Sequence, residues 1–300
     1  MSQRITPSMM SSTLLADLQN ITDALSQSQA QLSSGKRILE PSDDPFGTSR
    51  ALSYRADLAS NQQYQSNATD GSSWLDTADT ALGDISSLVQ RARDLVVQGA
   101  NSTNGASGNQ AIAAEIDQLI ESIKEAGNTQ YAGQYIFAGT KTSTQPYATG
   151  GVNDAYAGNT GVVSREIGPG VQVQVNVDGA SVIGDGSTAG TLLATLRQVS
   201  ADLKANDIGA LGSTDLQAID AAVDNVNTVR ATVGARADRL QTALSRLQQL
   251  QESGTKLLSN TEDADMAQTI TTYSQQQAVY QAALKAGANI IQPSLMDFLQ

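Results

Sequence analysis

Apolar side chains near both ends of the chain recur at alternating intervals of three and four positions, and this pattern restricts the possible folds more than any other feature. The pattern is typical of a helix that packs along one seam against another helix. Polar or small residues interrupt the seams at Ser28, Gln277 and Gly287. Isolated helices with such seams are marginal in water, so we expect neighbouring copies or partners to cover them. The predicted seam residues are Leu14, Leu18, Ile21, Leu25 and Leu32 in the first helix and Met266, Ile270, Tyr273, Tyr280, Leu284 and Ile291 in the last.

Prolines mark the boundaries between these terminal helices and the centre of the chain, because proline in a helix interior costs about 3 kcal/mol. Pro41 and Pro45 follow the first helix, and Pro293 is expected to stop the last one. The two long spans without proline, 46–145 and 170–292, carry helical periodicity over much of their length. We therefore predict long helices in both spans.

Periodicity within these spans places the individual helices. Apolar residues in 75–99 and again in 112–126 keep the helical spacing on either side of a turn rich in Gly, Asn and Ser. A short connection of this kind predicts that the two helices are antiparallel. After a pause at 207–213, a further long helix is expected to begin under an N-cap at Thr214.

The middle of the chain has no helical period. Val171, Val173, Val175 and Val177 alternate with polar residues, which predicts a half-buried strand, and five aromatic residues lie between 131 and 156. We predict a mainly α fold, an elongated coaxial helical bundle or coiled-coil rod with a small β-rich insertion domain. The expected segments are 1–40, an N-terminal coiled-coil helix for assembly; 41–138, the N-terminal half of the rod; 139–190, the outer insertion; 191–260, the C-terminal half of the rod; and 261–300, a C-terminal coiled-coil helix for assembly.

The chain contains neither cysteine nor histidine. Disulfides, the usual Cys/His zinc sites and catalytic systems that use Cys or His are therefore excluded, and we expect no catalytic residues, no metal site and no cofactor. The formal net charge of −12 argues against nucleic acid and anionic membranes as partners. No apolar run approaches the roughly 20 residues of a membrane span, and the N-terminus has no apolar stretch typical of a secretory signal. The protein is thus expected to be either cytoplasmic or exported by another route.

Two acidic clusters precede predicted helices, at 43–44 and at 262–265. Paired carboxylates could bind a divalent cation or act as acid and base. Capping of the helix that follows is the favoured interpretation, because carboxylates at helix N-termini accept free N–H groups and interact well with the helix dipole.

Several short motifs lie near the two ends of the chain. The amino end carries Arg-Ile-Thr-Pro-Ser-Met-Met at 4–10 and Leu-Ser-Ser-Gly-Lys-Arg-Ile at 32–38, and Pro-Ser-Asp-Asp-Pro follows at 41–45. Together with segments 128–139 and 261–267, these motifs resemble the flagellin superfamily. Flagellins usually continue the Asp-Asp pair with Ala-Ala, so the proline at position 45 favours the hook-associated branch of the family. Residues 1–140 and 214–300 carry the resemblance.

The resemblance implies a structural protein without catalysis, exported unfolded by the flagellar type III apparatus with a dedicated chaperone. It implies a secreted protein that forms a ring of copies at the hook–filament junction, with hook-associated protein 1 and flagellin as partners, and so supports motility. The segment around Arg91 and Arg93 resembles the flagellin region used in subunit packing. The apolar chain end is expected to dock on a partner or the chaperone, through Leu295, Met296, Phe298 and Leu299.

Two alternatives remain open. The first is a flagellin that builds the filament itself. The second, of another class, is a helical enzyme or carbohydrate-binding module that uses the aromatic residues of the insertion; a pocket with converging polar groups in 131–190 would favour it.

Overall fold

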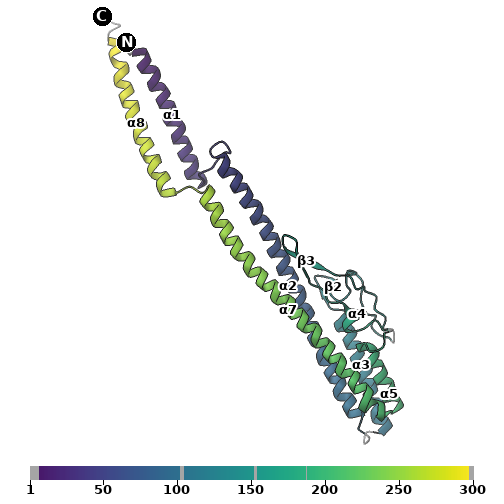
Figure 1. Cartoon of the computed structure of the whole chain (residues 1–300). Coiled ribbons are helices and arrows are strands. Elements are labelled where there is room, and N and C mark those ends of the chain that lie inside the picture. The colour runs from purple at the N-terminus through teal and green to yellow at the C-terminus, as the bar shows by residue number, and fades with distance from the viewer. Residues whose placement is uncertain (1–6, 102–104, 152–153, 187, 297–300) are drawn as a thin grey trace. The chain divides into compact units, whose positions relative to one another are not determined.

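The computed structural model describes residues 7–101, 105–151, 154–186 and 188–296 (Figure 1). Long helices dominate these residues, and the chain divides into two compact units. Unit 1 contains residues 1–60 and 250–300, and unit 2 contains residues 61–249. The helices α2 (Pro45–Gly99) and α7 (Leu216–Glu262) each contribute to both units. The five segments expected from the sequence remain a prediction.

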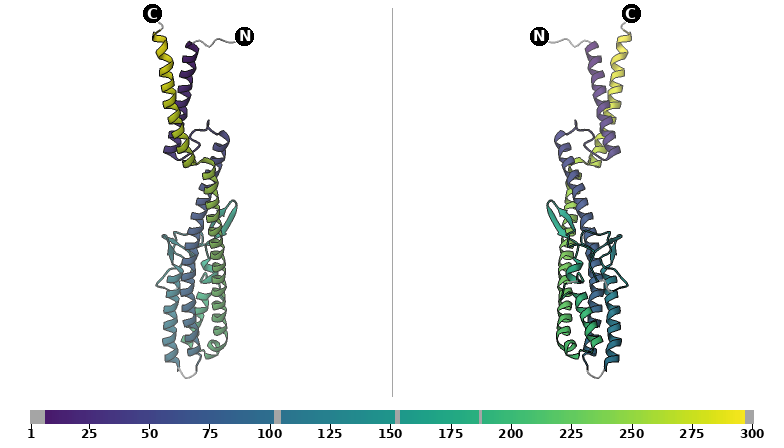
Figure 2. Two further views of the ribbon diagram at one scale, coloured as in Figure 1. Left: turned by 90° about the vertical axis from the view of Figure 1, so that its left-hand side faces the viewer. Right: turned by 90° about the vertical axis from the view of Figure 1, so that its right-hand side faces the viewer.

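Unit 1 is built around a pair of terminal helices, α1 (Pro7–Ser34) and α8 (Met266–Met296), which lie side by side and antiparallel (Figures 1 and 2). Proline suits the first position of α1, because the N–H that it lacks would have no partner in the helix. Gly35 ends α1 with a φ of 71°, a left-handed conformation that glycine adopts without strain, and its N–H bonds the carbonyl of Gln31 at 2.8 Å.

The predicted stop at Pro293 is wrong, since α8 continues to Met296. Proline lacks the N–H that would bond the carbonyl four residues earlier, and its ring crowds that carbonyl. Pro293 nevertheless lies in the last turn of α8, so it marks the end of the helix to within three residues.

Unit 2 is a helical bundle with one continuous core. Its helices are the remaining parts of α2 and α7 together with α3 (Gly105–Gly127) and α5 (Leu192–Ala205), and α3 packs against α5. The helical spacing predicted for 75–99 and 112–126 is confirmed, because the periodic residues there are buried. Core residues include Trp74, Leu75, Leu82, Ile85, Val89, Ile116, Ile120, Ile123, Leu193, Leu196, Val199, Val226, Val233 and Leu240.

The described residues between α3 and α5 form two short antiparallel hairpins and one helical turn. The hairpins are β1 (Gln130–Tyr131) with β2 (Gln134–Tyr135) and β3 (Ser164–Gly168) with β4 (Val171–Gln174), and the turn is α4 (Gly179–Val182). The strand predicted over 171–177 forms as β4, but it ends at Gln174. Val173, Val175 and Val177 are buried, whereas Val171 is exposed beside the irregular register at Gly168.

The start of α7 differs from the prediction. The turn α6 (Ile208–Ala210) runs into a π-helical segment, η1 (Leu211–Asp215), and this continues directly into α7. Thr214 is therefore not an N-cap, and its hydroxyl donates to the carbonyl of Ala210 instead. Asp207 is the cap, since its carboxylate accepts the N–H of Ala210 at 3.0 Å. The pause expected at 207–213 is therefore helical from Ile208 onward.

None of the helices in the described ranges combines the length and the hydropathy that a membrane-spanning segment requires.

Candidate assembly surfaces

The covered side of α1 is the row that the sequence predicted. Leu14, Leu18, Ile21, Leu25 and Leu32 are all half-buried. The polar interruption of this row, Ser28, is only 6% exposed, and its hydroxyl donates to Oε1 of Gln276 at 2.8 Å. A buried polar pair in an otherwise apolar seam fixes the register of two helices.

The covered side of α8 is only partly the predicted row. Tyr273 and Tyr280 are half-buried as expected, but Met266, Ile270 and Leu284 are 43%, 53% and 47% exposed. The helix covers Thr269, Gln276 and Ala283, each one position before a member of the predicted row, and shares its other positions with that row, so the covered face is turned by about 50°. This orientation places Gln276 against Ser28 and brings the small Gly287 against Leu14. The covered positions of α8 are Thr269, Tyr273, Gln276, Tyr280, Ala283 and Gly287.

Most of the large apolar side chains that the described residues expose belong to unit 1. Exposed apolar groups that gather in one region mark interaction sites in soluble proteins. Beside the three predicted seam residues of α8, they are Met9, Met10, Leu15, Leu39, Phe46, Leu52, Leu250, Leu257 and Val279.

The predicted docking tail can be followed only in part. For Ile291, Leu295 and Met296 the structure describes helical backbone in α8 and no side-chain environment. Phe298 and Leu299 lie outside the described residues. The role of these residues in assembly stays a prediction.

A dense set of contacts, which we call the joint, connects the segment after α1 with the segment between α7 and α8. The N–H of Arg37 donates to the carbonyl of Glu262 at 2.6 Å, and the N–H of Ala264 donates to the carbonyl of Gly35 at 2.9 Å. The Arg37 guanidinium also reaches the carbonyl of Thr261 at 2.8 Å. All these contacts lie within unit 1.

The acidic residues at the joint have two different roles. Asp44 and Asp265 are helix caps, as predicted: Asp44 accepts the N–H of Gly47 at 2.8 Å, and Asp265 accepts those of Ala267 and Gln268. The hydrogen bond from Gly47 is the main cause that lowers the pKa of Asp44. Glu262 contradicts the capping interpretation. It is the last residue of α7, only 7% exposed, and its carboxylate pairs with Lys36 and Arg55.

Arg91 and Arg93 form ion pairs inside unit 2. Arg91 binds Glu115 of α3 at 2.6 Å, and Arg93 binds Asp220 of α7 at 2.6 Å. The hydrogen bond and the charge of Asp220 raise the pKa of Arg93. Both pairs are well exposed, so they stabilise the bundle weakly. The predicted role of the two arginines between subunits stays a prediction.

A buried charge network, which the sequence analysis missed, ties the segment after the first hairpin to α3 and α5. The Lys124 ammonium is completely buried and lies 2.7 Å from a carboxylate oxygen of Asp154, whose other oxygen accepts from Arg197 at 2.7 Å. Burial raises the pKa of Asp154, but Arg197 and Lys124 outweigh this effect and hold the pKa below its usual value. The signal in the sequence was a lysine four residues after Ile120, on the apolar face of its helix.

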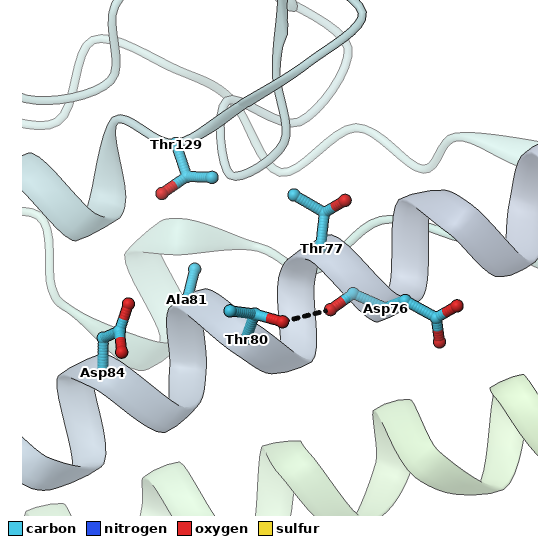
Figure 3. Close-up of a pocket in the computed structure, with 6 residues that line it drawn as sticks. All are labelled: Asp76, Thr77, Thr80, Ala81, Asp84 and Thr129. Carbon is cyan, nitrogen blue, oxygen red and sulfur yellow. Dashed lines mark hydrogen bonds between the residues drawn. The ribbon is translucent and has the colours of Figure 1, made fainter.

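Two open pockets among the described residues are relevant to the enzyme hypothesis. The larger, about 390 Å³, lies along one face of α2 between Asp76 and Asp84, with Thr129 opposite (Figure 3). The smaller, about 230 Å³, lies in the insertion beside Tyr156, whose hydroxyl donates to the carbonyl of Phe137 within the fold. Among the described residues, no group of three acidic side chains is placed to hold a metal ion. The hypothesis concerned a pocket in 131–190, and the pocket found there is lined by three alanines together with Gln145 and Tyr156, so it does not favour an enzyme or carbohydrate site.

Comparison with known proteins supplies the context for these surfaces. The profile of the bacterial flagellin N-terminal helical region matches residues 5–142, and that of the C-terminal helical region matches 216–299. Together the two matches span well over half of the chain. They include α1 and α8 and the joint between them.

Hook-associated proteins and flagellins are both similar to this chain over most of its length. Flagellar hook-associated protein 3 of Escherichia coli (strain K12) is 27% identical over 277 residues, which cover 85% of this chain and 87% of that protein. A flagellin of Bacillus subtilis (strain 168) is 28% identical over 298 residues, which cover 94% of this chain and 95% of that one. The solved structure of the flagellar junction protein FlgL from Legionella pneumophila has the same fold, with a TM-score of 0.58 and 14% identity over 73% of this chain and all of that one.

Proposed function

The chain belongs to the bacterial flagellin family, and from this membership we propose that it is a structural adaptor at the hook–filament junction of the bacterial flagellum. The relative in E. coli is named for the hook-associated proteins, and the junction protein of L. pneumophila has a similar fold along its whole length. The proline after Asp43-Asp44 favours the same branch of the family. In this role the protein is secreted, contributes to motility and performs no catalysis.

The observation that carries the proposal is the surface of unit 1. A terminal helix pair that covers one seam and leaves a second apolar row at Met266, Ile270 and Leu284 in solvent is incomplete alone. Copies of the chain that pack side by side in a ring would cover such a row. The mechanism is then geometric, because the ring presents one side to hook-associated protein 1 and the other to flagellin.

Export precedes assembly in this proposal. The chain would pass unfolded through the type III export apparatus, with a chaperone bound to its apolar end. A chain without cysteine cannot form wrong disulfides on arrival outside the cell.

Location decides between this function and the nearest rival, a filament subunit. We would express a tagged copy in cells that lack the gene and label it for electron microscopy. The proposal expects a single labelled band between hook and filament, and cells without the protein that make hooks but shed flagellin. Label along the whole filament would show a flagellin and overturn the proposal.

A further inference from the structure

Two arginines of unit 2 differ from the other cations of that unit. The other lysines and arginines bond carboxylates or carbonyls of the same unit; Arg230 of α7, for example, binds Asp79 of α2 at 3.0 Å. Arg239 and Arg246 of α7 are exposed, and among the described residues neither bonds a carboxylate or a carbonyl. They are seven positions apart, so they lie on one side of the helix with about 10 Å between them along its axis. We call this pair the basic row.

A row of the opposite charge lies on α2. Asp76 and Asp84 are exposed and make no ion pair with any described residue, and the exposed Thr80 lies between them. All three line the open pocket of about 390 Å³ along this side of α2 (Figure 3). The two aspartates, which we call the acidic row, are about 12 Å apart along the axis. The two rows therefore carry opposite charges at nearly the same spacing.

The two rows of one chain cannot meet each other. The ion pair of Asp79 with Arg230, and the hydrogen bond from Asn61 to the carbonyl of Leu247 at 2.8 Å, fix α2 and α7 antiparallel and at one relative height. At this height the basic row lies level with residues of α2 between Asn61 and Asp79. The centre of the acidic row lies about 20 Å further along the axes. A partner that neutralises either row must come from outside the chain.

We propose that the basic row on α7 of one copy docks against the acidic row on α2 of a second copy. The inference rests on the proposed function, because that function requires copies of the chain to lie side by side. A second copy is the occupant that the charges favour, since each copy carries both rows and their spacings match. The neighbour is displaced by about 20 Å along the helix axes, because the rows of one chain differ in height by this distance. Exposed ion pairs contribute little affinity, but complementary charges fix the register of two surfaces.

Chemical cross-linking between engineered cysteines tests this contact without background, because the chain has no cysteine of its own. Thr80 lies between the two aspartates, and Thr242 lies between the two arginines; both are exposed. We would isolate flagella from cells that carry the full-length variant Thr80→Cys/Thr242→Cys and add a short bismaleimide. Denaturing gels should show dimers and larger multiples of the chain, and either single variant should give only the monomer.

A second cysteine pair tests the displacement of the neighbour. Thr232 is also an exposed threonine of α7, but it lies close to the height of Thr80, as the ion pair between Asp79 and Arg230 shows. Neighbours at equal height would therefore be linked in Thr80→Cys/Thr232→Cys. The displaced arrangement predicts that this variant gives no multiples.

Charge reversal tests whether the rows themselves make the contact. Arg239→Glu/Arg246→Glu, introduced into the Thr80→Cys/Thr242→Cys chain, should lower the yield of linked copies by about tenfold or more, because like charges then face each other. Asp76→Arg/Asp84→Arg should have the same effect. The chain with all four reversals again has opposite charges on the two rows, so its yield should return towards that of the unreversed chain.

Two measurements control for general effects of these substitutions. Glu125→Arg/Asp224→Arg reverses two exposed carboxylates outside the rows and should leave the yield unchanged. The single tryptophan, Trp74, is 1% exposed in the core of unit 2, so its fluorescence in each purified variant shows that the bundle has folded.

Three results would overturn the docking of the two rows. They are the absence of linked copies in flagella that contain the protein at the junction, links through Thr232 in place of Thr242, and a four-charge variant that links as poorly as either two-charge variant. Each would leave the proposed function standing, because immunolabelling of the same flagella locates the protein independently. Label along the whole filament together with the expected links would instead overturn the proposed function and support the contact between copies.

Discussion

Asp215 is a single residue whose environment opposes its charge. It ends the π-helical segment η1 and is 5% exposed. Burial, and then the neighbouring charge and hydrogen bond of Asp202, raise its pKa from 3.8 to about 6. The folded chain therefore binds this proton more tightly than the unfolded chain does. The stability that the protonated form contributes is complete below the unfolded pKa and is lost as the pH rises through 6.

Replacement of Asp215 by Asn should therefore stabilise the protein above pH 7, by about 1–3 kcal/mol, and have little effect near pH 4. Chemical denaturation at the two pH values measures the difference. The exposed Asp224 of α7 provides the control, because Asp224→Asn removes the same charge without relieving burial. If Asp215→Asn destabilised the fold at pH 8, the buried carboxylate would have to make favourable contacts as an anion.

Lys124 is the opposite case, a buried charge that its partners satisfy. Lys124→Met should lower the free energy of unfolding by about 2–4 kcal/mol, because the buried carboxylate of Asp154 loses its fully buried partner and keeps only Arg197. Lys204→Met is the matched control: its ion pair with Asp117 is 54% exposed on the lysine side, and its loss should cost less than about 1 kcal/mol. Equal losses for the two variants in denaturant titrations would contradict the buried network.

At the scale of elements, the sequence predicted α1 better than α8. The seam of α1 has one apolar row, so its leucines and Ile21 could be assigned to the covered face from spacing alone. The last helix has two candidate rows that share Tyr273, Tyr280 and Gly287 and differ by one position elsewhere, and both satisfy the same period. The choice depends on α1, where Ser28 provides a partner for Gln276. Periodicity within one helix contains no information about its partner.

The close approach at Gly287 gives a test of how tightly α1 and α8 pack. A Cβ at position 287 would lie 2.7 Å from Cδ2 of Leu14, so Gly287→Leu should disturb the pair by about 1–3 kcal/mol and raise amide exchange in α8. Helix propensity alone acts in the opposite direction by about 1 kcal/mol. The exposed Ala282 is the control, since Ala282→Leu should leave the pair intact. Slower exchange in Gly287→Leu would mean that the two helices do not approach here.

The other misjudged elements have similar physical causes. Pro293 was taken as a stop because proline breaks helix interiors, but α8 continues for three residues beyond it. Residues 207–213 were taken as a pause, and only the three-dimensional path shows that α6 and η1 continue the helix through them. Lys124 could have been recognised as a buried charge from its position on the apolar face of α3. Its partner Asp154 could not, because it lies in a segment without periodicity.

At the scale of the whole molecule, the covered and the exposed apolar rows of the terminal helices have different expected roles. The covered row stabilises the helix pair, and the exposed row is expected to take part in assembly. Leu25 is half-buried on the paired face of α1, and Leu284 is 47% exposed on α8. Leu25→Asp should therefore weaken the helix pair and prevent junction formation. Leu284→Asp should leave the free chain as stable as the wild type and still prevent junction formation, because copies would bury the new charge.

Denaturant titrations of the free chain and motility of cells that carry each variant measure the two effects. Gln281→Asp, at an exposed polar position of α8, controls for the added charge. Motile, filament-bearing cells with Leu284→Asp would show that this row is not part of the interface.

The hydrogen bond between Asn61 and Leu247 has a consequence for the order in which the chain folds. The side-chain amide of Asn61 donates to the carbonyl of Leu247 at 2.8 Å, so α2 and α7 are already adjacent where they leave unit 2. Ser28 and Gln276, by contrast, are 248 residues apart, and closing a loop of that length in an unfolded chain carries a large entropic cost. Once unit 2 has formed, the same contact closes only the two short arms that extend from Asn61 and Leu247. The terminal pair should thus be the last part of the chain to fold and the first to open, which keeps its apolar surface free until the rest of the molecule is complete.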